Sequence, residues 1–221
     1  MASPARKALE ILALAVVLAA GLAGPSRADF DAGVAAHKDG DYAAALAEWM
    51  PLAKQGHAHA QYNLGAMYVR GEGVPQDYAQ AVYWFERAAL QRHARAQYHL
   101  GSAYAEGLGV SRDYARAAAL FRRAGEQGHM DARYRLGQMY AKGRGIPRDY
   151  IRAHVWLALA AEQGSNKAAK SIKLVAERMM RSEIAEAQRL ARKLKARKGG
   201  LSPIQDPGRP RWFPVPFGGG E

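Results

Sequence analysis

The chain contains no cysteine among its 221 residues. This absence excludes disulfide bonds, thiolate metal sites, a cysteine nucleophile and a lipid-modified N-terminal cysteine. Acidic residues are also scarce, 20 against 32 basic ones, so the formal net charge is +12. Hydrophobic residues nonetheless make up 49% of the chain, a normal globular balance rather than that of a disordered chain. Apolar burial alone must therefore stabilise the fold.

The N-terminal apolar run is too short to cross a bilayer, since a spanning helix needs about 20 residues. It extends over the 13 residues from Ile11 to Ala23 and follows the basic residues Arg6 and Lys7. Small residues then lead to the sequence Ser26-Arg27-Ala28, as in a cleavable secretory signal. We expect residues 1–28 to be removed by cleavage after Ala28, which makes the protein periplasmic or secreted. The alternative is an uncleaved N-terminal segment that anchors it.

A motif recurs at an offset of 36 residues through the middle of the chain. Ala60-Gln61-Tyr62-Asn63-Leu64-Gly65 returns as Ala96-Gln97-Tyr98-His99-Leu100-Gly101 and as Ala132-Arg133-Tyr134-Arg135-Leu136-Gly137. Other residue types keep the same offset; in the first copy they are Tyr68, Gly71, Gly73, Asp77-Tyr78, Ala81 and Gln91. So many coincident positions indicate a repeat architecture.

Each copy predicts two helices. Ala60, Leu64 and Met67 fall on one helical face, and Gly71 can take the left-handed conformation that ends a helix. Asp77 is a natural N-cap for the second helix, because its carboxylate can accept the free backbone N–H groups of the first turn. The copies are therefore predicted to be helix pairs that stack on their neighbours.

Two sets of glycines carry further predictions. Gly65 and its equivalents lie inside the first helix, where glycine costs roughly 1 kcal/mol relative to alanine. Close approach of the second helix, with Ala81 facing the glycine, would offset that cost. A second set closes the second helices, at Gly56, Gly128 and Gly164. Arg92 stands at this position in the remaining copy, so its turn is expected to differ.

The recurring pattern Ala-x-Tyr-x-Leu-Gly-x-x-Tyr, Gly-x-Gly-Val/Ile and Asp-Tyr-x-x-Ala resembles the Sel-one-like repeat (SLR) family, a branch of the tetratricopeptide-repeat (TPR) superfamily. The resemblance implies an all-α fold, a right-handed α-solenoid of antiparallel helix pairs. Three SLR-type copies cover residues 57–164. Residues 29–56 form an earlier, shorter unit, which lacks the four-residue glycine loop and is closer to an ordinary TPR motif.

The repeat pattern fades after Gly164. Residues 165–198 are expected to form a basic helical C-terminal cap, which solenoids need at their ends. Its helices are predicted over residues 167–179 and 182–198, with Ser182 capping the second. The segment from Lys167 to Lys198 holds eleven Lys and Arg against three Glu. This excess fits either a solvated face or contact with an anionic surface, and nucleic acid is not an expected partner.

Residues 199–221 hold six glycines and five prolines. This composition predicts a disordered tail. Trp212 and Phe213 within it are either a short docking motif or incidental aromatics.

The sequence shows no recognisable set of catalytic residues. His57 and His59 form the one close histidine pair but lack the further ligands of a closed metal site. His57, His93 and His129 share one repeat position, which favours a turn or capping role. The glycine pairs follow a helix, so they do not indicate a phosphate-binding loop. We therefore predict no catalytic residues, no cofactor and no metal. Exported relatives described as acting on β-lactams resemble a cysteine-rich subgroup, which this chain does not match.

The remaining candidate site is the concave groove that the first helices of such an array line. If the TPR face assignment transfers, its residues are His59, Tyr62, Arg70, Arg95, Tyr98, Glu106, Asp131, Tyr134 and Lys142. Aromatic residues provide contact area and varied charges provide specificity, although the invariant tyrosines also suit packing between units. We expect a non-catalytic scaffold of the bacterial cell envelope that binds a protein or peptide. The alternatives are an envelope enzyme acting on peptidoglycan or a β-lactam, and an anionic-surface binding module.

Overall fold

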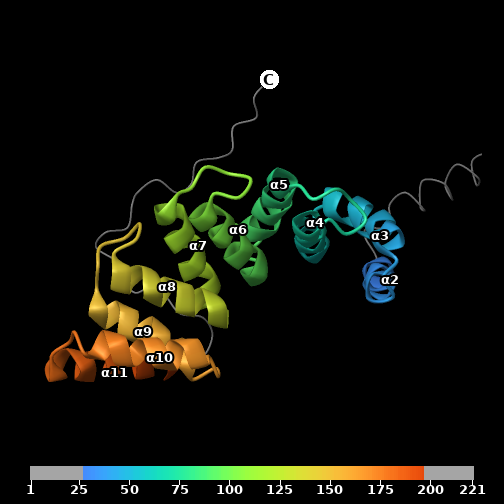
Figure 1. The fold of residues 1–221 in the computed structure, drawn as a ribbon. Helices are drawn as coiled ribbons and strands as arrows, with labels where there is room; N and C mark the ends of the chain where they lie inside the picture. The colour runs from blue at the N-terminus through green and yellow to red at the C-terminus, as the bar shows by residue number, and fades with distance from the viewer. Residues whose placement is uncertain (1–26, 197–221) are drawn as a thin grey trace, which may run out of the picture. The chain divides into compact units, whose positions relative to one another are not determined.

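The computed structural model describes residues 27–196 (Figure 1). All regular elements in this range are α-helices. They are α2 (Arg27–Lys38), α3 (Tyr42–Lys54), α4 (Ala58–Arg70), α5 (Tyr78–Leu90), α6 (Ala94–Glu106), α7 (Tyr114–Glu126), α8 (Met130–Lys142), α9 (Tyr150–Ala161), α10 (Asn166–Ala176) and α11 (Arg181–Ala196). Successive helices pack as pairs, such as α4 with α5 and α8 with α9. The predicted all-α solenoid of helix pairs is confirmed.

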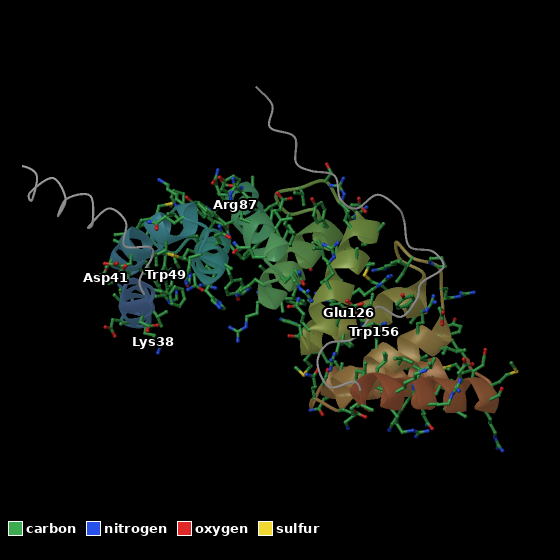
Figure 2. The ribbon with its side chains drawn as sticks, turned by 180° about the vertical axis from the view of Figure 1, so that it is seen from behind. Lys38, Asp41, Trp49, Arg87, Glu126 and Trp156 are labelled. Carbon is green, nitrogen blue, oxygen red and sulfur yellow. The ribbon has the colours of Figure 1, made fainter. Side chains whose placement is uncertain are left out.

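The described residues divide into two compact units. The first runs up to Ala124 and the second begins at Gly125, so the division falls inside α7. Apart from Arg27 and Ala28, which begin α2, the predicted signal segment lies outside the described residues, and the predicted tail lies wholly outside them. In Figure 2, Trp49 marks the core of the first unit and Trp156 that of the second; their exposed fractions are 3% and 2%.

Capping side chains begin and end the helices as the sequence predicts. The carboxylate of Asp77 accepts the backbone N–H groups of Ala79 and Gln80 at 2.8 and 3.0 Å, at the start of α5. Gly71 follows α4 with a φ of 70°, the left-handed conformation that glycine adopts at no steric cost. Both predicted caps are confirmed.

The glycine inside each first helix accommodates a large side chain of the second helix. A Cβ atom on Gly65 would lie 2.6 Å from Cε1 of Phe85, and one on Gly101 would lie 2.9 Å from Cε1 of Phe121. The predicted close approach is therefore present. The group that fills the space is the ring of Phe85, four residues beyond Ala81, because the ring reaches back over the preceding turn.

The turn at Arg92 was expected to differ from its glycine equivalents, and this expectation is wrong. Arg92 has a φ of 64° and is the one non-glycine residue with positive φ among the described residues. The glycines at equivalent positions include Gly56 and Gly128, with φ of 97° and 93°. Packing of the flanking helices keeps the turn conformation, and Arg92 carries the resulting backbone strain.

Two further helices complete the second unit after the last repeat. Both α10 and α11 pack against α9 (Figure 1), and they bury Ala168, Val175, Ala187 and other small apolar side chains. The prediction that Ser182 caps α11 is wrong, since the helix begins at Arg181. The carboxylate of Glu183 instead accepts the N–H of Met180 at 2.7 Å, as in one half of a capping box.

Candidate partner-binding site

Glutamines join neighbouring repeats in the first unit. Nε2 of Gln91, at the end of α5, donates to the carbonyl oxygen of Gly56 and to Oε1 of Gln61, both at 2.8 Å. The amide of Gln61 donates in turn to the carbonyl oxygen of Ala53 at 3.0 Å. Gln61 is only 4% exposed, and its bond satisfies the buried carbonyl group of Ala53. These hydrogen bonds hold α4 in register with the helices on either side.

Arginine takes the place of glutamine in the second unit. Nε of Arg133 donates to the carbonyl oxygen of Gly125 at 2.8 Å, and Nη1 of Arg133 donates to Oε1 of Gln163 at 3.0 Å. Gln163 donates to the carbonyl oxygen of Gly128 at 2.9 Å. The same inter-repeat connection is therefore made with a different donor. The recurrence of these glutamines was visible in the sequence, but their partners were not.

Histidines cap the first helices of the three full repeats. Nδ1 of His57 accepts the N–H of Ala60 at 3.2 Å, and Nδ1 of His93 accepts the N–H of Ala96 at 3.2 Å. In the second unit, Nδ1 of His129 accepts the corresponding N–H at 3.3 Å. The capping role predicted from their shared repeat position is confirmed.

A direct bond between two imidazoles crosses from one repeat to the next. Nε2 of His93 lies 3.0 Å from Nδ1 of His59. Because Nδ1 of His93 accepts the N–H of Ala96, the proton of the neutral ring is on Nε2, which donates to His59. The neutral ring of His59 then carries its own proton on Nε2. This assignment follows from the hydrogen-bond network.

Further rings extend this contact into a continuous row along α4 and α6. The ring centroids of Tyr62 and His93 are 4.8 Å apart and stacked, and those of Phe30 and His57 are 4.9 Å apart. Tyr98 lies 5.2 Å from His99. We call this set the aromatic–imidazole row; its members are Phe30, His57, His59, Tyr62, His93, Tyr98 and His99. His59 is exposed and the others are half-buried, so each ring of the row remains partly accessible to solvent.

The predicted groove residues fall into two groups. His59, Tyr62 and Tyr98 belong to the aromatic–imidazole row, and Arg95 and Glu106 are exposed on α6 in the same unit. The other group lies on α8 in the second unit and consists of Asp131, Tyr134 and Lys142. The structure brings the row together within the first unit. Sequence reasoning did not place Phe30, His57, His93 or His99 in this row, because their ring contacts join different helices.

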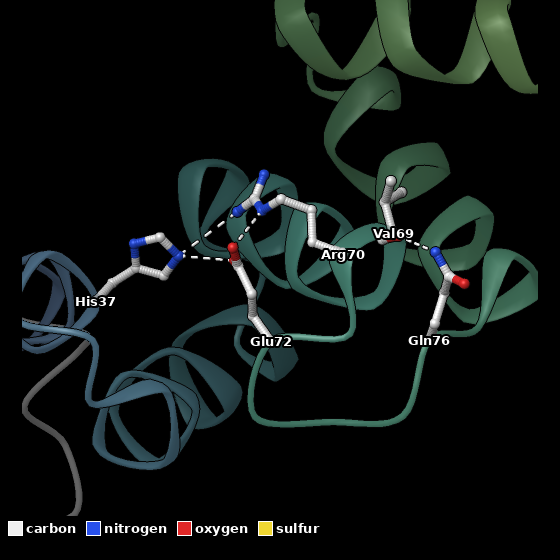
Figure 3. A network of polar contacts seen from close by, with 5 residues as sticks. All are labelled: His37, Val69, Arg70, Glu72 and Gln76. Atoms are coloured by element: carbon white, nitrogen blue, oxygen red, sulfur yellow. Dashed lines mark hydrogen bonds and ion pairs between the residues drawn. The ribbon is translucent and has the colours of Figure 1, made fainter.

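Arg70, the remaining groove candidate, is exposed and forms an ion pair with a residue of its own repeat (Figure 3). Its Nε lies 2.6 Å from Oε1 of Glu72, and Oε2 of Glu72 lies 3.0 Å from Nε2 of His37 on α2. Hydrogen bonds from Arg70, and then from His37, hold the pKa of Glu72 below its usual range. Gln76 closes the same loop by donating to the carbonyl oxygen of Val69 at 2.7 Å. Arg70 therefore fastens the glycine loop.

The histidines do not form a metal site of the ordinary kind. Within residues 27–196 no three His, Asp or Glu side chains are grouped so as to hold a metal ion. The pair His59 and His93 is close enough for two ligands, but the lone pair of His93 Nδ1 is used by Ala96 and its Nε2 carries a proton. A ligating nitrogen must have its lone pair free, so binding through Nε2 would require loss of the helix cap.

The C-terminal helices α10 and α11 carry a basic, exposed surface. All nine Lys and Arg residues between 166 and 196 are exposed, against three Glu in the same range. Lys195 pairs with Glu162 at 3.1 Å. Leu174 and Met180 are 62% and 66% exposed among these cations. None of the helices in the described range is both long and apolar enough to cross a membrane.

Comparisons with known proteins identify the family. The family profile described as Sel1 repeat matches residues 58–93, 94–129 and 131–165. A Sel1 repeat protein from Oxalobacter formigenes is 34% identical with a TM-score of 0.62, and the match covers 64% of this chain and 58% of that protein. The protein c5321 of uropathogenic Escherichia coli is 35% identical with a TM-score of 0.68, over 81% of this chain and 40% of that protein.

This chain is a member of the Sel1-like repeat family. The protein c5321 is described as a protective antigen that displays an SLR fold. The chain spans 58% and 40% of the lengths of these two proteins. No protein with curated annotation matches the sequence. Sel1-like repeats are generally non-catalytic protein–protein interaction modules.

Proposed function

We propose that this protein is a non-catalytic scaffold or adaptor of the bacterial cell envelope, and that it binds a protein or peptide partner along the aromatic–imidazole row. The observation that carries the proposal is the row itself. Its rings contact one another across repeats, as between Tyr62 and His93, and all remain at least partly exposed. Rigid aromatic side chains with few rotatable bonds provide contact area at a low entropy cost.

The envelope location is supported by the N-terminal sequence. A short apolar run after Arg6 and Lys7, followed by small residues up to Ala28, is typical of an export signal. Intact mass measurement of the exported protein tests this part. The expected mass is that of a chain that begins at Asp29. A mass that corresponds to a chain beginning at Met1 would show that the N-terminal segment is retained as an anchor.

Site-specific photo-crosslinking in intact cells tests the binding surface. A photoreactive phenylalanine analogue is placed at Tyr98, in the row, or at Tyr83, which is 41% exposed on α5 and lies outside the row. We expect the Tyr98 position to yield a defined adduct, identified by mass spectrometry, that the Tyr83 position does not yield. The same adduct from both positions, or adducts from Tyr83 alone, would contradict the assignment.

A second candidate function is contact with an anionic surface through α10 and α11. The exposed cations of these helices, with Leu174 and Met180 among them, match the chemistry of an anionic lipid headgroup layer. Sedimentation with phosphatidylcholine vesicles, with and without phosphatidylglycerol, tests it. Binding is expected to require phosphatidylglycerol and to fall as salt is added.

Substitutions that remove positive charge test whether vesicle binding depends on this surface or on the net charge of the protein. Lys167, Lys170 and Lys173 replaced together by Gln should weaken vesicle binding at least about tenfold. Replacement of Lys54 and Arg87, exposed cations of the first unit, should have little effect. Equal losses for both variants would show that net charge alone is responsible.

A further inference from the structure

Three hydrogen bonds at the aromatic–imidazole row require uncharged imidazoles. Nδ1 of His57 accepts the N–H of Ala60, Nδ1 of His93 accepts the N–H of Ala96, and Nδ1 of His59 accepts from His93. A proton added to any of these Nδ1 atoms would place two N–H groups against each other, and the bond would be lost. Neutral imidazole rings are therefore required at the start of α4, at the start of α6 and in the contact between these two helices.

The surroundings of His57 and His93 disfavour a positive charge. Burial lowers the pKa of His93 to about 4, and repulsion from His59 on α4 and Arg95 on its own helix adds to this effect. Tyr62 of α4 stacks on the same ring. Burial, and then repulsion from His59, also lowers the pKa of His57, against which Phe30 of α2 packs.

We infer that the aromatic–imidazole row is an acid-sensitive site, in which protonation of the imidazoles opens the first turns of α4 and α6. A proton on Nδ1 of His93 removes the acceptor for the N–H of Ala96, and a proton on Nδ1 of His59 removes the acceptor for the bond from His93. The inference rests on the proposed function for one consequence only, which is that a bound partner is released in acid.

Linkage gives the direction and the range of the effect. A histidine in an opened first turn titrates near its ordinary pKa of 6.5, whereas that of His93 in the closed state is about 4. The open state therefore binds more protons between these values, and opening becomes more favourable as the pH falls through this range. Below about pH 4 both states are protonated and the effect levels off. Each pH unit within the range can change the opening equilibrium up to about tenfold.

The protein contains an internal reference that does not titrate. Ser165 occupies the corresponding repeat position in the second unit, where its hydroxyl accepts the N–H of Ala168 at 3.3 Å. A hydroxyl keeps this capacity at every pH in the range. The amide of Ala168 should therefore keep its protection while the amides of Ala60 and Ala96 lose theirs.

Amide hydrogen exchange of the full chain, without a partner, tests the inference. Protection factors at Ala60, Ala96 and Ala168 are measured at about pH 7.5 and about pH 5, with the intrinsic pH dependence of exchange divided out. We expect protection at Ala96 to fall about tenfold or more relative to Ala168. A parallel change at the two amides, or no change at Ala96, would overturn the inference.

A substitution at the N-cap of α6 distinguishes an effect of histidine titration from general fraying at the start of the helix. Asparagine is a strong N-cap that does not titrate, so His93→Asn should remove the acid-dependent loss at Ala96 and leave the loss at Ala60. Persistence of the loss at Ala96 in a folded His93→Asn protein would count against the mechanism.

Nitrogen NMR of the wild-type imidazoles provides a measurement that needs no variant. His59 and His93 should both be Nε2–H tautomers near pH 7.5, and a proton on Nδ1 of His93 would overturn the inference. Because the exchange and NMR measurements use the free protein, they succeed or fail independently of the partner crosslinks that test the proposed function.

Discussion

Nε2 of His93 lies 3.0 Å from Nδ1 of His59, and this one contact connects the start of α6 to the start of α4. The same His93 ring caps its own helix through Nδ1. One side chain thus links local helix stability to the contact between repeats.

Global stability should decrease in acid because of this histidine. Its pKa is about 4 in the folded protein and 6.5 in a free chain, so the unfolded state binds more protons between these values. His93 stabilises the fold fully above pH 6.5, and its contribution falls between pH 6.5 and about 4. We expect a loss of about 1–2 kcal/mol, reduced from the full linkage value because the ring is partly exposed.

Urea unfolding of the wild type and of His93→Asn across this pH range measures the contribution. As the pH falls, the free energy of unfolding should decrease more for the wild type than for His93→Asn. Parallel pH profiles for the two proteins would mean that His93 does not titrate as described.

Replacement of Arg92 by glycine should stabilise the first unit. Arg92 holds a φ of 64°, which costs a side chain roughly 1 kcal/mol and costs glycine little. Arg92→Gly is expected to raise the free energy of unfolding by about 0.5–1 kcal/mol. Gly128→Ala is the reciprocal control, since Gly128 has a φ of 93°, and it should lower stability. Chemical denaturation of both variants checks the pair, and destabilisation by Arg92→Gly would contradict the strain argument.

A methyl group on Gly65 should disrupt the contact with α5. Its Cβ would lie 2.6 Å from the ring of Phe85, so Gly65→Ala is expected to cost about 1–3 kcal/mol despite the better helix propensity of alanine. Part of this cost should disappear in the background of Phe85→Ala, because removal of the ring leaves room for the methyl group. A double-mutant cycle measures the coupling, and strictly additive effects would show that the two residues do not interfere.

The inter-repeat bonds of Gln91 predict a measurable loss on truncation. Its amide donates to Gly56 and to Gln61, so Gln91→Ala leaves acceptors at a partly buried interface without that donor. A cost of about 1–2 kcal/mol is expected. Gln55 is an exposed residue at the equivalent position of the first repeat, and Gln55→Ala should change stability by no more than about 0.5 kcal/mol. Similar losses for both variants, measured by urea unfolding, would assign no special role to Gln91.

Much of the fold was readable along the chain, because repeat geometry is encoded locally. Glycine after a helix and aspartate before one determine where helices end and begin, and Gly71 and Asp77 act as predicted. A local signal was misleading at the start of α11. Ser182 has the chemistry of an N-cap, but the helix begins one residue earlier, at Arg181, and Glu183 accepts the N–H of Met180.

The candidate site was predicted less completely. The 36-residue offset identified Tyr62 and Tyr98 as equivalent positions, and the positions of His57 and His93 before helices indicated caps. The offset carries no information on which rings touch across repeats. The offset also gave no indication that Arg70 forms an ion pair with Glu72 and lies close to His37.

The sequence by itself determined the helix pairs of the repeats, the caps at Gly71 and Asp77, and the repeat period, since these depend on caps, glycines and apolar spacing within a few residues. Only the tertiary structure decided that His93 donates to His59, that Phe85 fills the space above Gly65, and that Arg92 keeps the turn of its glycine equivalents. The physical reason is that these features depend on side chains from different helices meeting at distances of a few ångströms. Gly65 and Phe85, and likewise His59 and His93, are distant in the sequence and meet only after the helices have packed.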